Sequence, residues 1–388
     1  MQIRPKVRMT TLVTCATLAH FLLMSVVAKS EPHSKRVYIG TYTGPTSKGI
    51  YLSYFDSATG KLSPPEVAAE TTNPSFLALH PGGQWLYAVG EVSSYQGKAE
   101  GVVSSFRIDQ SNGQLTLLNQ QPSGGGGPCH LALDKTGKCL LVANYGSGSV
   151  AALPVESDGR LGSPGMSVQH HGSSLNPQRQ AEPHAHFITP DPNNTFVLAC
   201  DLGLDKVLVY RLSPMQASLT PDDPPSGSLK PGSGPRHLAF NPNGRFLYVI
   251  NELSSSLTTC SYDPGKGILK ELETRSTLPP EFKGENSCAE VQMHPSGSFV
   301  YGSNRGHNSI AVFRINPRDG RIQRIEDVAC GGKTPRHFAL DPSGRWLLVE
   351  NQDSNNVLVF AVDLSSGRLM PTAEKIEVGA PVCLVFAP

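Results

Sequence analysis

Residues 234–253 have the sequence GPRHLAFNPNGRFLYVINEL. Two runs of aliphatic and aromatic residues flank the turn Asn-Pro-Asn-Gly, a pattern that predicts two antiparallel strands joined by a tight hairpin. Arg236 stands before the first run and Glu252 follows the second. The meaning of that placement depends on whether the stretch is repeated elsewhere in the chain.

The stretch belongs to a repeat that runs through the chain. Similar segments occupy residues 73–91, 127–145, 183–202, 287–306 and 334–352, and a final fragment, APVCLVFAP, ends the sequence. Aligned on the residue before each turn, which is Pro except at Lys135, successive copies lie 46 to 57 residues apart. A Gly or Asn two positions later supplies the positive φ that a tight turn needs. A long period with several short strands per unit is typical of β-propeller blades.

The two ends of the sequence complete one another. The last repeat has a first strand only, and the segment from Val37 onward supplies strand-like runs without a first strand of their own. Joining them gives one further blade and leaves no unpaired sheet edge. We therefore predict an all-β fold, a seven-bladed β-propeller formed by residues 31–388 and closed by strands from both termini.

The first thirty residues have a different composition. Arg4, Lys6 and Arg8 precede an apolar run at residues 11–27, and Ala28-Lys29-Ser30 follows. This arrangement predicts a signal peptide over residues 1–30, cleaved after Ser30, and export to the periplasm or the medium. An uncleaved N-terminal anchor is the alternative. We expect no other contact with a membrane.

Composition excludes some classes of function. Lys plus Arg number 33 and Asp plus Glu number 32, which argues against a nucleic-acid partner. Seven cysteines remain beyond the predicted signal peptide, an odd number, and no CxxC pair or Cys/His cluster suggests zinc. We expect neither a metal nor a cofactor.

Polar residues gather at the open ends of the predicted hairpins. If each hairpin folds about its Gly or Asn, the residue six before the aligned position faces the one ten after it. The facing pairs are then Ser75 with Glu91, Cys129 with Tyr145, His186 with Leu202, Arg236 with Glu252, Ala289 with Arg305, and Arg336 with Gln352. Unlike polar residues on one face of a propeller indicate a composite pocket at the mouth of the central channel. Solvated or salt-bridged strand ends are the alternative.

Equivalent positions of the aligned repeats form columns, and the facing pairs named above make up two open-end columns. Two further columns have structural roles in this scheme. One column contains His130, His237, Glu290 and His337, which we expect to form hydrogen bonds between blades. The other column lies four positions after the aligned residue and contains Trp85, Phe196, Phe246, Phe299 and Trp346. Its rings are expected to pack between neighbouring blades.

Several motifs resemble those of the propeller-type lactonase family. They are PHAH followed by DLGLDKVLVY, GPRHLAF followed by NEL, AEVQMHPSGSFVYGSNRG, and NQDS, and the resemblance extends from about Val37 to Pro388. The family includes bacterial 6-phosphogluconolactonases and the fungal carboxymuconate-lactonizing enzyme. The resemblance implies a seven-bladed fold and a catalytic set that corresponds here to His186, Arg236, Glu252 and Arg305.

The resemblance implies a lactone hydrolase with a small-molecule lactone as its partner. In this scheme Glu252 is the general base and His186 the acid or alternate base. Arg236 and Arg305 hold the oxyanion or a substrate anion. Additional substrate contacts are expected from His184, which lies two residues from His186, and from Arg336, Gln352 and Tyr145.

The substrate and the class of function both have alternatives. The resemblance favours 6-phosphogluconolactone, whereas export favours an unphosphorylated aldonolactone, and the same scaffold serves a muconolactone. A propeller that binds a ligand or a protein without catalysis is the rival from another class.

Overall fold

The computed structural model of this protein describes residues 1–2 and 34–387. Residues 34–387 lie in one compact unit. The predicted signal peptide and its cleavage site after Ser30 lie, apart from residues 1–2, outside the described residues. Among the described residues, no helix has the length and apolar character needed to span a bilayer.

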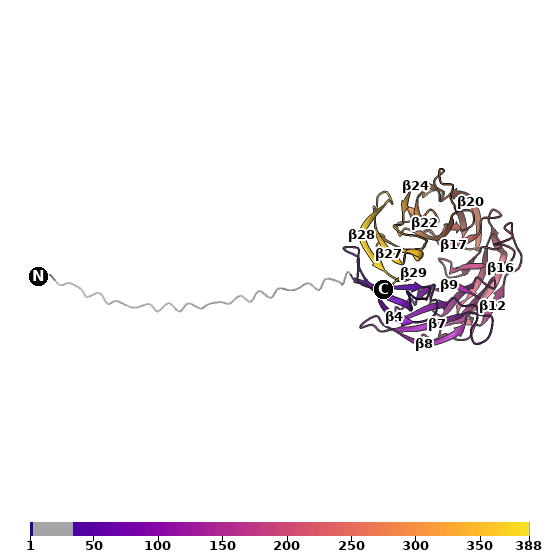
Figure 1. Cartoon of the computed structure of the whole chain (residues 1–388), viewed down its shortest axis with the longest axis horizontal. Helices are drawn as coiled ribbons and strands as arrows, with labels where there is room; N and C mark the ends of the chain where they lie inside the picture. Colours follow the sequence, from indigo (N-terminus) through magenta and orange to yellow (C-terminus); the bar gives the residue numbers. More distant parts are fainter. Residues whose placement is uncertain (3–33, 388) are drawn as a thin grey trace. The chain divides into compact units, whose positions relative to one another are not determined.

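The compact unit is a propeller of seven antiparallel sheets around a central channel (Figure 1). The innermost strands are β5 (Leu77–Leu79), β9 (Pro128–Leu133), β13 (Ala185–Pro190), β17 (Pro235–Phe240), β21 (Ser287–Met293), β25 (Pro335–Leu340) and β29 (Pro381–Phe386). The second strands are β6 (Trp85–Gly90), β10 (Cys139–Asn144), β14 (Phe196–Asp201), β18 (Phe246–Asn251), β22 (Phe299–Arg305), β26 (Trp346–Asn351) and β1 (Ser34–Thr41). The predicted repeat is therefore the inner hairpin of every blade but the one that contains β29 and β1.

The outer half of each blade comes from the residues between repeats. The third strands are β7 (Val102–Ile108), β11 (Ser149–Pro154), β15 (Lys206–Ser213), β19 (Ser256–Asp263), β23 (Ser309–Ile315), β27 (Asn356–Val362) and β2 (Gly49–Asp56). The rim strands are β8 (Leu115–Pro122), β12 (Met166–Gln169), β16 (Ser218–Ser228), β20 (Ile268–Ser276), β24 (Ile322–Ala329), β28 (Leu369–Glu377) and the short β3 (Lys61–Leu62) and β4 (Glu66–Glu70). Two 3₁₀ turns, η1 (Pro214–Gln216) and η2 (Gln352–Ser354), are the helical elements of the described chain.

Strands from both ends of the chain form the closing blade, as predicted. β29 pairs antiparallel with β1, with Tyr38 opposite Val385 and Ile39 opposite Leu384, and β1 pairs with β2. The first and last described strands of the compact unit are thereby joined by hydrogen bonds within one sheet, which completes the ring of seven blades.

The blades pack through the bulky column that the repeat predicted. The Trp346 ring lies edge-on to Phe55 in the next blade, with centroids 6.4 Å apart, and Trp346 Nε1 donates to Ser57 O at 2.9 Å. Phe299 lies so close to Gly367 that a Cβ there would approach the ring to 2.4 Å. The column fixes the spacing of the blades because it fills the space between two sheets.

The predicted pairing of open-end residues is wrong by one position. His237 lies opposite Ile250 and Pro235 opposite Asn251, so Arg236 is the extra residue of a β-bulge and has no directly facing partner. The cause is the turn, whose axis falls between residues 243 and 244 because Asn241 N donates to Phe246 O at 2.9 Å.

The same bulge recurs around the channel. It falls on Cys129, His186 and Arg336 in their blades, spans 289–290 in another and falls on Val382 in the closing blade. A bulge twists the strand and redirects the side chain of the extra residue. The bulges therefore point the open-end residues of the innermost strands toward the channel mouth.

Candidate active site

A cavity of about 340 Å³ lies at the channel mouth. It is lined by Glu91, Cys129, Tyr145, Arg179, His186, Glu252, Ser287, Arg305 and Arg336. Seven of these nine belong to the open-end columns of the repeat; Arg179 and Ser287 do not. The structure thus brings residues from many blades into one composite pocket.

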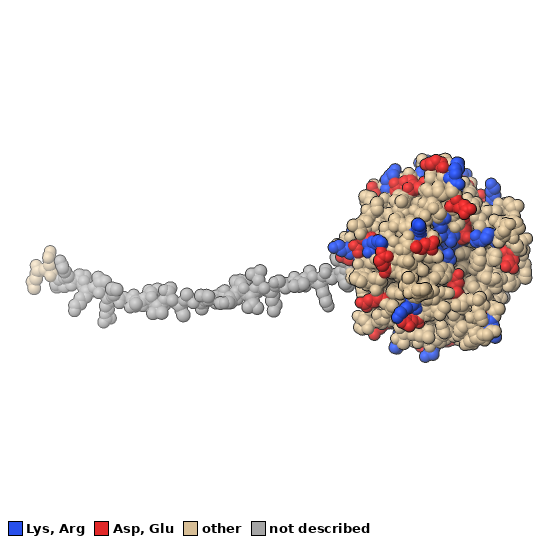
Figure 2. Space-filling model, viewed as in Figure 1, with Lys and Arg blue, Asp and Glu red and all other residues tan. Residues whose placement is uncertain are grey.

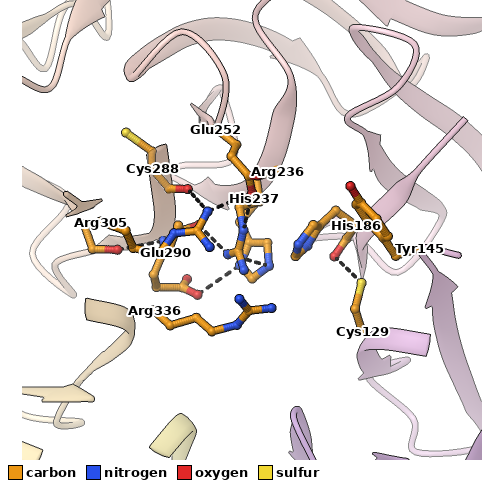
Figure 3. A network of polar contacts seen from close by, with 12 residues as sticks. Cys129, Tyr145, His186, Arg236, His237, Glu252, Cys288, Glu290, Arg305 and Arg336 are labelled. Atoms are coloured by element: carbon orange, nitrogen blue, oxygen red, sulfur yellow. Dashed lines mark hydrogen bonds and ion pairs between the residues drawn. The ribbon is translucent and has the colours of Figure 1, made fainter. Parts of the chain in front are cut away.

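Glu252 is the centre of an arginine cluster on one wall (Figure 3). Its Oε1 accepts from Arg179 Nη2 at 2.7 Å, and its Oε2 lies 3.1 Å from Arg236 Nε and 2.9 Å from Arg305 Nη2. Burial raises the pKa of this carboxyl, but the charges of Arg305 and Arg236 outweigh that effect and lower the pKa to about 2. Glu252 is therefore ionised at neutral pH, with both oxygens engaged.

Arg236 lies beneath the pocket floor. Its side chain is 3% exposed, and its Nη1 donates to the backbone oxygen of Ala289 in the next blade at 2.7 Å. Burial and the charges of Arg305 and Arg336 lower its pKa to about 10, so it remains a cation at neutral pH. Its contacts are with protein groups, which makes it a support for Glu252.

Arg305 reaches the cavity from the end of β22. Its Nη2 donates to the Cys288 backbone oxygen at 2.8 Å as well as to Glu252. Its Nε is buried and has no hydrogen-bond partner in the protein. An unpaired guanidinium donor in a pocket wall is suited to bind an oxygen of a ligand.

His186 forms part of the opposite wall. Its ring lies edge-on to Tyr145 and to His237, with centroids 5.4 and 5.2 Å away, and its Nδ1 is buried without a partner. Burial, together with the charges of Arg236 and Arg336, holds the pKa of His186 well below its ordinary value. Its imidazole is therefore neutral, and Figure 3 shows the nitrogen-bearing edge of the ring turned toward the middle of the cluster.

Glu91 is a second carboxylate in the wall. It follows β6, and its Oε2 accepts from Ser75 Oγ at 2.5 Å and from Tyr42 OH at 2.9 Å. The Arg336 guanidinium lies over the Tyr42 ring, 5.2 Å from its centroid, and Arg336 Nη2 donates to Tyr42 OH at 2.8 Å. The repeat placed Glu91 in an open-end column, but nothing in its spacing distinguished it from the other members. Tyr42 gave no signal in the sequence.

Arg179 comes from the loop between β12 and β13. The loop is fastened by Gln180, which is fully buried and donates through Nε2 to Leu202 O at 2.8 Å. Ser174 Oγ donates to Asp205 Oδ2 at 2.5 Å. These contacts hold Arg179 over the cavity, where its side chain is 41% exposed and its Nη2 lies 3.2 Å from Tyr145 OH. The loop lies outside the repeat, so the repeat could not predict Arg179.

Two predicted substrate contacts are not in the cavity wall. His184 stacks on Tyr145 with centroids 4.4 Å apart, and its Nδ1 lies 3.0 Å from the Tyr145 backbone oxygen. It supports the tyrosine from behind, because the bulge at His186 takes the cavity-facing position. Gln352 begins η2, where its backbone N donates to Thr334 O at 3.0 Å. That turn keeps Gln352 out of the cavity wall.

A layer of buried imidazoles and carboxyls lies below the pocket. His237 Nδ1 is 2.9 Å from Glu290 Oε2, and His337 Nδ1 is 2.7 Å from Glu350 Oε2. His337 Nε2 lies 3.7 Å from Glu290 Oε2. Burial raises the pKa of Glu290 to about 7 against the charges of His337 and Arg236. The hydrogen bond of His337 to Glu350 lies within one blade, whereas His237 and Glu290 are joined between blades, as predicted. Backbone donors of the next blade complete the prediction, since Ile188 N donates to His130 Nδ1 and Leu384 N to His337 Nδ1, both at 3.3 Å.

The cysteines and acidic groups offer no further reactive site among the described residues. Cys129, Cys139, Cys200, Cys260, Cys288, Cys330 and Cys383 are all free and buried. Within residues 34–387, no three or more His, Cys, Asp or Glu side chains are grouped so as to hold a metal ion. Figure 2 shows both signs of charge scattered over one face of the propeller, without an extended patch of one sign.

Comparisons with known proteins agree with this geometry. Residues 36–386 match the family model described as lactonase, 7-bladed β-propeller. A 6-phosphogluconolactonase of Bacillus subtilis is 36% identical over 349 residues, which are 90% of this chain and 97% of that protein. One from Formosa agariphila is 33% identical over 79% of this chain and 86% of its own length. The structure of a periplasmic gluconolactonase of Pseudomonas aeruginosa superimposes with a TM-score of 0.86 and 36% identity, covering 92% of this chain and 99% of that one.

Proposed function

Because the chain belongs to the seven-bladed β-propeller family of lactonases and is a lactone hydrolase, we propose that it opens an aldonolactone that carries an anionic group, in the cavity at the channel mouth. 6-Phosphogluconolactone is the first candidate. The observation that carries this proposal is the charge of the pocket. Three arginines and two glutamates line it and Arg236 lies beneath, so these six residues have a net charge of +2.

The arginines differ in what they offer a substrate. Arg236 is buried, with Nε on Glu252 and Nη1 on the Ala289 backbone oxygen, whereas Arg305 has an unpaired Nε and Arg179 is 41% exposed. Guanidinium binds carboxylate and phosphate oxygens in a bidentate manner. We assign the oxyanion that develops on the lactone carbonyl to Arg305, and the anionic substituent to Arg179 at the rim.

Glu252 has a different role in this scheme from that expected of a general base. A base that acts near neutral pH is most effective when its pKa lies near that pH. Burial raises the pKa of Glu252, but the charges of Arg305 and Arg236 outweigh this effect and lower the pKa to about 2. Its oxygens also already accept hydrogen bonds from three arginines. Glu252 therefore orders the arginines and keeps their charges close together.

An unphosphorylated aldonolactone is a second candidate. Export, which the first thirty residues predict, would separate the protein from phosphorylated intermediates of the cytoplasm. The similar structure from Pseudomonas aeruginosa is described as a periplasmic gluconolactonase. With such a substrate, Arg179 would bind hydroxyl oxygens instead of a phosphate.

The test is a comparison of turnover on two fresh substrates that differ only in the phosphate. Purified protein is given 6-phosphogluconolactone or gluconolactone, and the lactone is followed against the rate of spontaneous opening. A higher kcat/KM for the phosphorylated lactone supports the first candidate, and a preference for gluconolactone supports the second. Rates equal to spontaneous opening with both lactones would refute the proposal.

A further inference from the structure

We propose that Glu91 is the general base of this hydrolysis, and that it activates a water held at the pocket floor between its carboxylate and His186. The inference rests on the proposed function, because it assigns a residue to the same reaction. It follows from the contrast between the two carboxylates of the wall and from a small cavity that Glu91 and His186 both line.

Glu91 has one oxygen without a protein donor, whereas both oxygens of Glu252 accept from arginines. The Ser75 and Tyr42 hydroxyls both donate to Glu91 Oε2, and among the described residues no protein group donates to Oε1. Neutral hydroxyls fix the orientation of a carboxylate without cancelling its charge. Among the described residues no Lys or Arg forms an ion pair with Glu91, and Arg336 donates to the Tyr42 hydroxyl instead.

The small cavity has room for one water molecule. Its volume is about 10 Å³, and it shares Glu91, Cys129, His186 and Arg336 with the main cavity. A polar cavity of about that size, with two to four polar partners, holds one ordered water. Glu91 can accept a hydrogen bond from such a water.

His186 supplies the second partner. It is 6% exposed, and its Nδ1 has no partner in the protein although it is buried. Buried polar atoms are nearly always hydrogen-bonded to protein or to ordered water. A neutral imidazole can orient the water without competing for its proton, because the pKa of His186 is held low by burial and by Arg236 and Arg336.

The steps balance without a further reactant. The water oxygen bonds to the lactone carbonyl carbon while one water proton passes to the Glu91 carboxylate, and the carbonyl electrons move to the oxygen beside Arg305. The tetrahedral intermediate then breaks its ring C–O bond. The departing alkoxide takes the proton from Glu91, which regenerates the carboxylate. The new carboxylic acid of the product releases a proton to solvent.

The test compares Glu91→Gln and Glu91→Ala with Glu70→Gln, a control at an exposed carboxylate paired with Lys48 at 3.4 Å. Loss of a positioned base is expected to lower kcat by about 10²–10⁴-fold in both Glu91 variants, with KM changed far less. Thermal unfolding of each variant verifies that it is folded. Added formate should restore turnover in Glu91→Ala with saturation, and should not accelerate the control.

The outcomes separate the two proposals. If the wild type opens lactones and Glu91→Gln does so equally fast, the base assignment is wrong while the proposed function stands. A loss that formate does not restore would also overturn it, since Glu91 would then only position other groups. If the wild type opens neither lactone, the proposed function falls and the base assignment falls with it.

Discussion

Arg305 Nη2 and Glu252 Oε2 lie 2.9 Å apart across the boundary between two neighbouring blades. The two residues are 53 positions apart, about one repeat, and each lies at the open end of its hairpin. The pocket is assembled from such contacts between blades, so its charge depends on the packing of the propeller as well as on any one strand.

Glu252→Gln should destabilise the protein as well as impair binding. The amide removes the ion-pair partner of Arg236, which is buried, and breaking a buried ion pair in this way costs about 3–5 kcal/mol. Urea unfolding at neutral pH measures the loss. Glu70→Gln is the control, because its pair with Lys48 is 69% exposed on both sides and such pairs contribute about 0–1 kcal/mol.

The effect of Glu252→Gln should also depend on pH. The pKa of Glu252 is lowered to about 2 because Arg305 and Arg236 outweigh the effect of burial, which raises it. Its ionised form therefore stabilises the fold above about pH 4.5, and this stabilisation is lost as pH falls toward about 2. The difference between wild type and variant should shrink over that window. A difference in unfolding free energy that is unchanged at about pH 3 would contradict this account.

Glu290→Gln should show the opposite dependence. Burial raises the pKa of Glu290 to about 7, although His337 and Arg236 oppose it. Between about pH 4.5 and 7 the folded protein binds more protons at this site than the unfolded chain does, so the wild type loses stability as pH rises. The amide stays neutral and lacks that loss. The melting temperature of the variant relative to that of the wild type should rise from about pH 5 to about pH 8. A difference between the two melting temperatures that stays constant over this range would refute the prediction.

Arg179→Ala should separate the two candidate substrates. Hydrogen bonds to charged groups contribute about 1.5–3 kcal/mol, so removal of the rim guanidinium should raise KM for 6-phosphogluconolactone roughly 10–100-fold. The KM for gluconolactone should change much less. Steady-state kinetics on both lactones test this, with Arg275→Ala, at an exposed arginine of β20, as the control. Equal effects on both substrates would place the phosphate elsewhere.

Gly367→Ala should reveal the packing between blades. Gly367 has φ +78°, and a Cβ there would lie 2.4 Å from the Phe299 ring. Gly244 also has positive φ, +68°, but a Cβ there would meet nothing closer than 3.9 Å. Both substitutions strain the backbone, and only the first adds a clash, which should cost about 1–3 kcal/mol more in urea unfolding. Equal losses would show that Phe299 can move aside.

The fold could be predicted from the sequence because the same strand-turn-strand pattern recurs at a nearly regular spacing along the chain. The first segment lacks an innermost strand, and the last repeat consists of an innermost strand alone. Together they predicted the closing blade, which forms through the pairing of β29 with β1. The hairpin register could not be predicted correctly, because the position of the turn axis and the bulge at Arg236 depend on backbone hydrogen bonds that residue types alone do not specify.

The candidate site could be predicted in part. His186, Glu252, Arg305, Arg336 and Tyr145 line the cavity because each occupies the open end of a repeated hairpin, and Arg236 lies beneath them. Arg179 could not be found, because its position depends on a loop held by the buried Gln180. The repeat placed Glu91 in an open-end column. Its role could not be distinguished from that of Glu252, because the difference depends on the hydrogen bonds that each carboxylate accepts in the structure.

Proton release on adding fresh lactone, measured for the wild type beside Arg305→Ala and Glu70→Gln, tests the central claim most directly. The account predicts that the wild type and Glu70→Gln exceed spontaneous opening with at least one of the two lactones. The rate of Arg305→Ala should fall by about 10²–10³-fold, the effect of removing one oxyanion donor. No acceleration by the wild type, or full activity in Arg305→Ala, would contradict hydrolysis in this pocket.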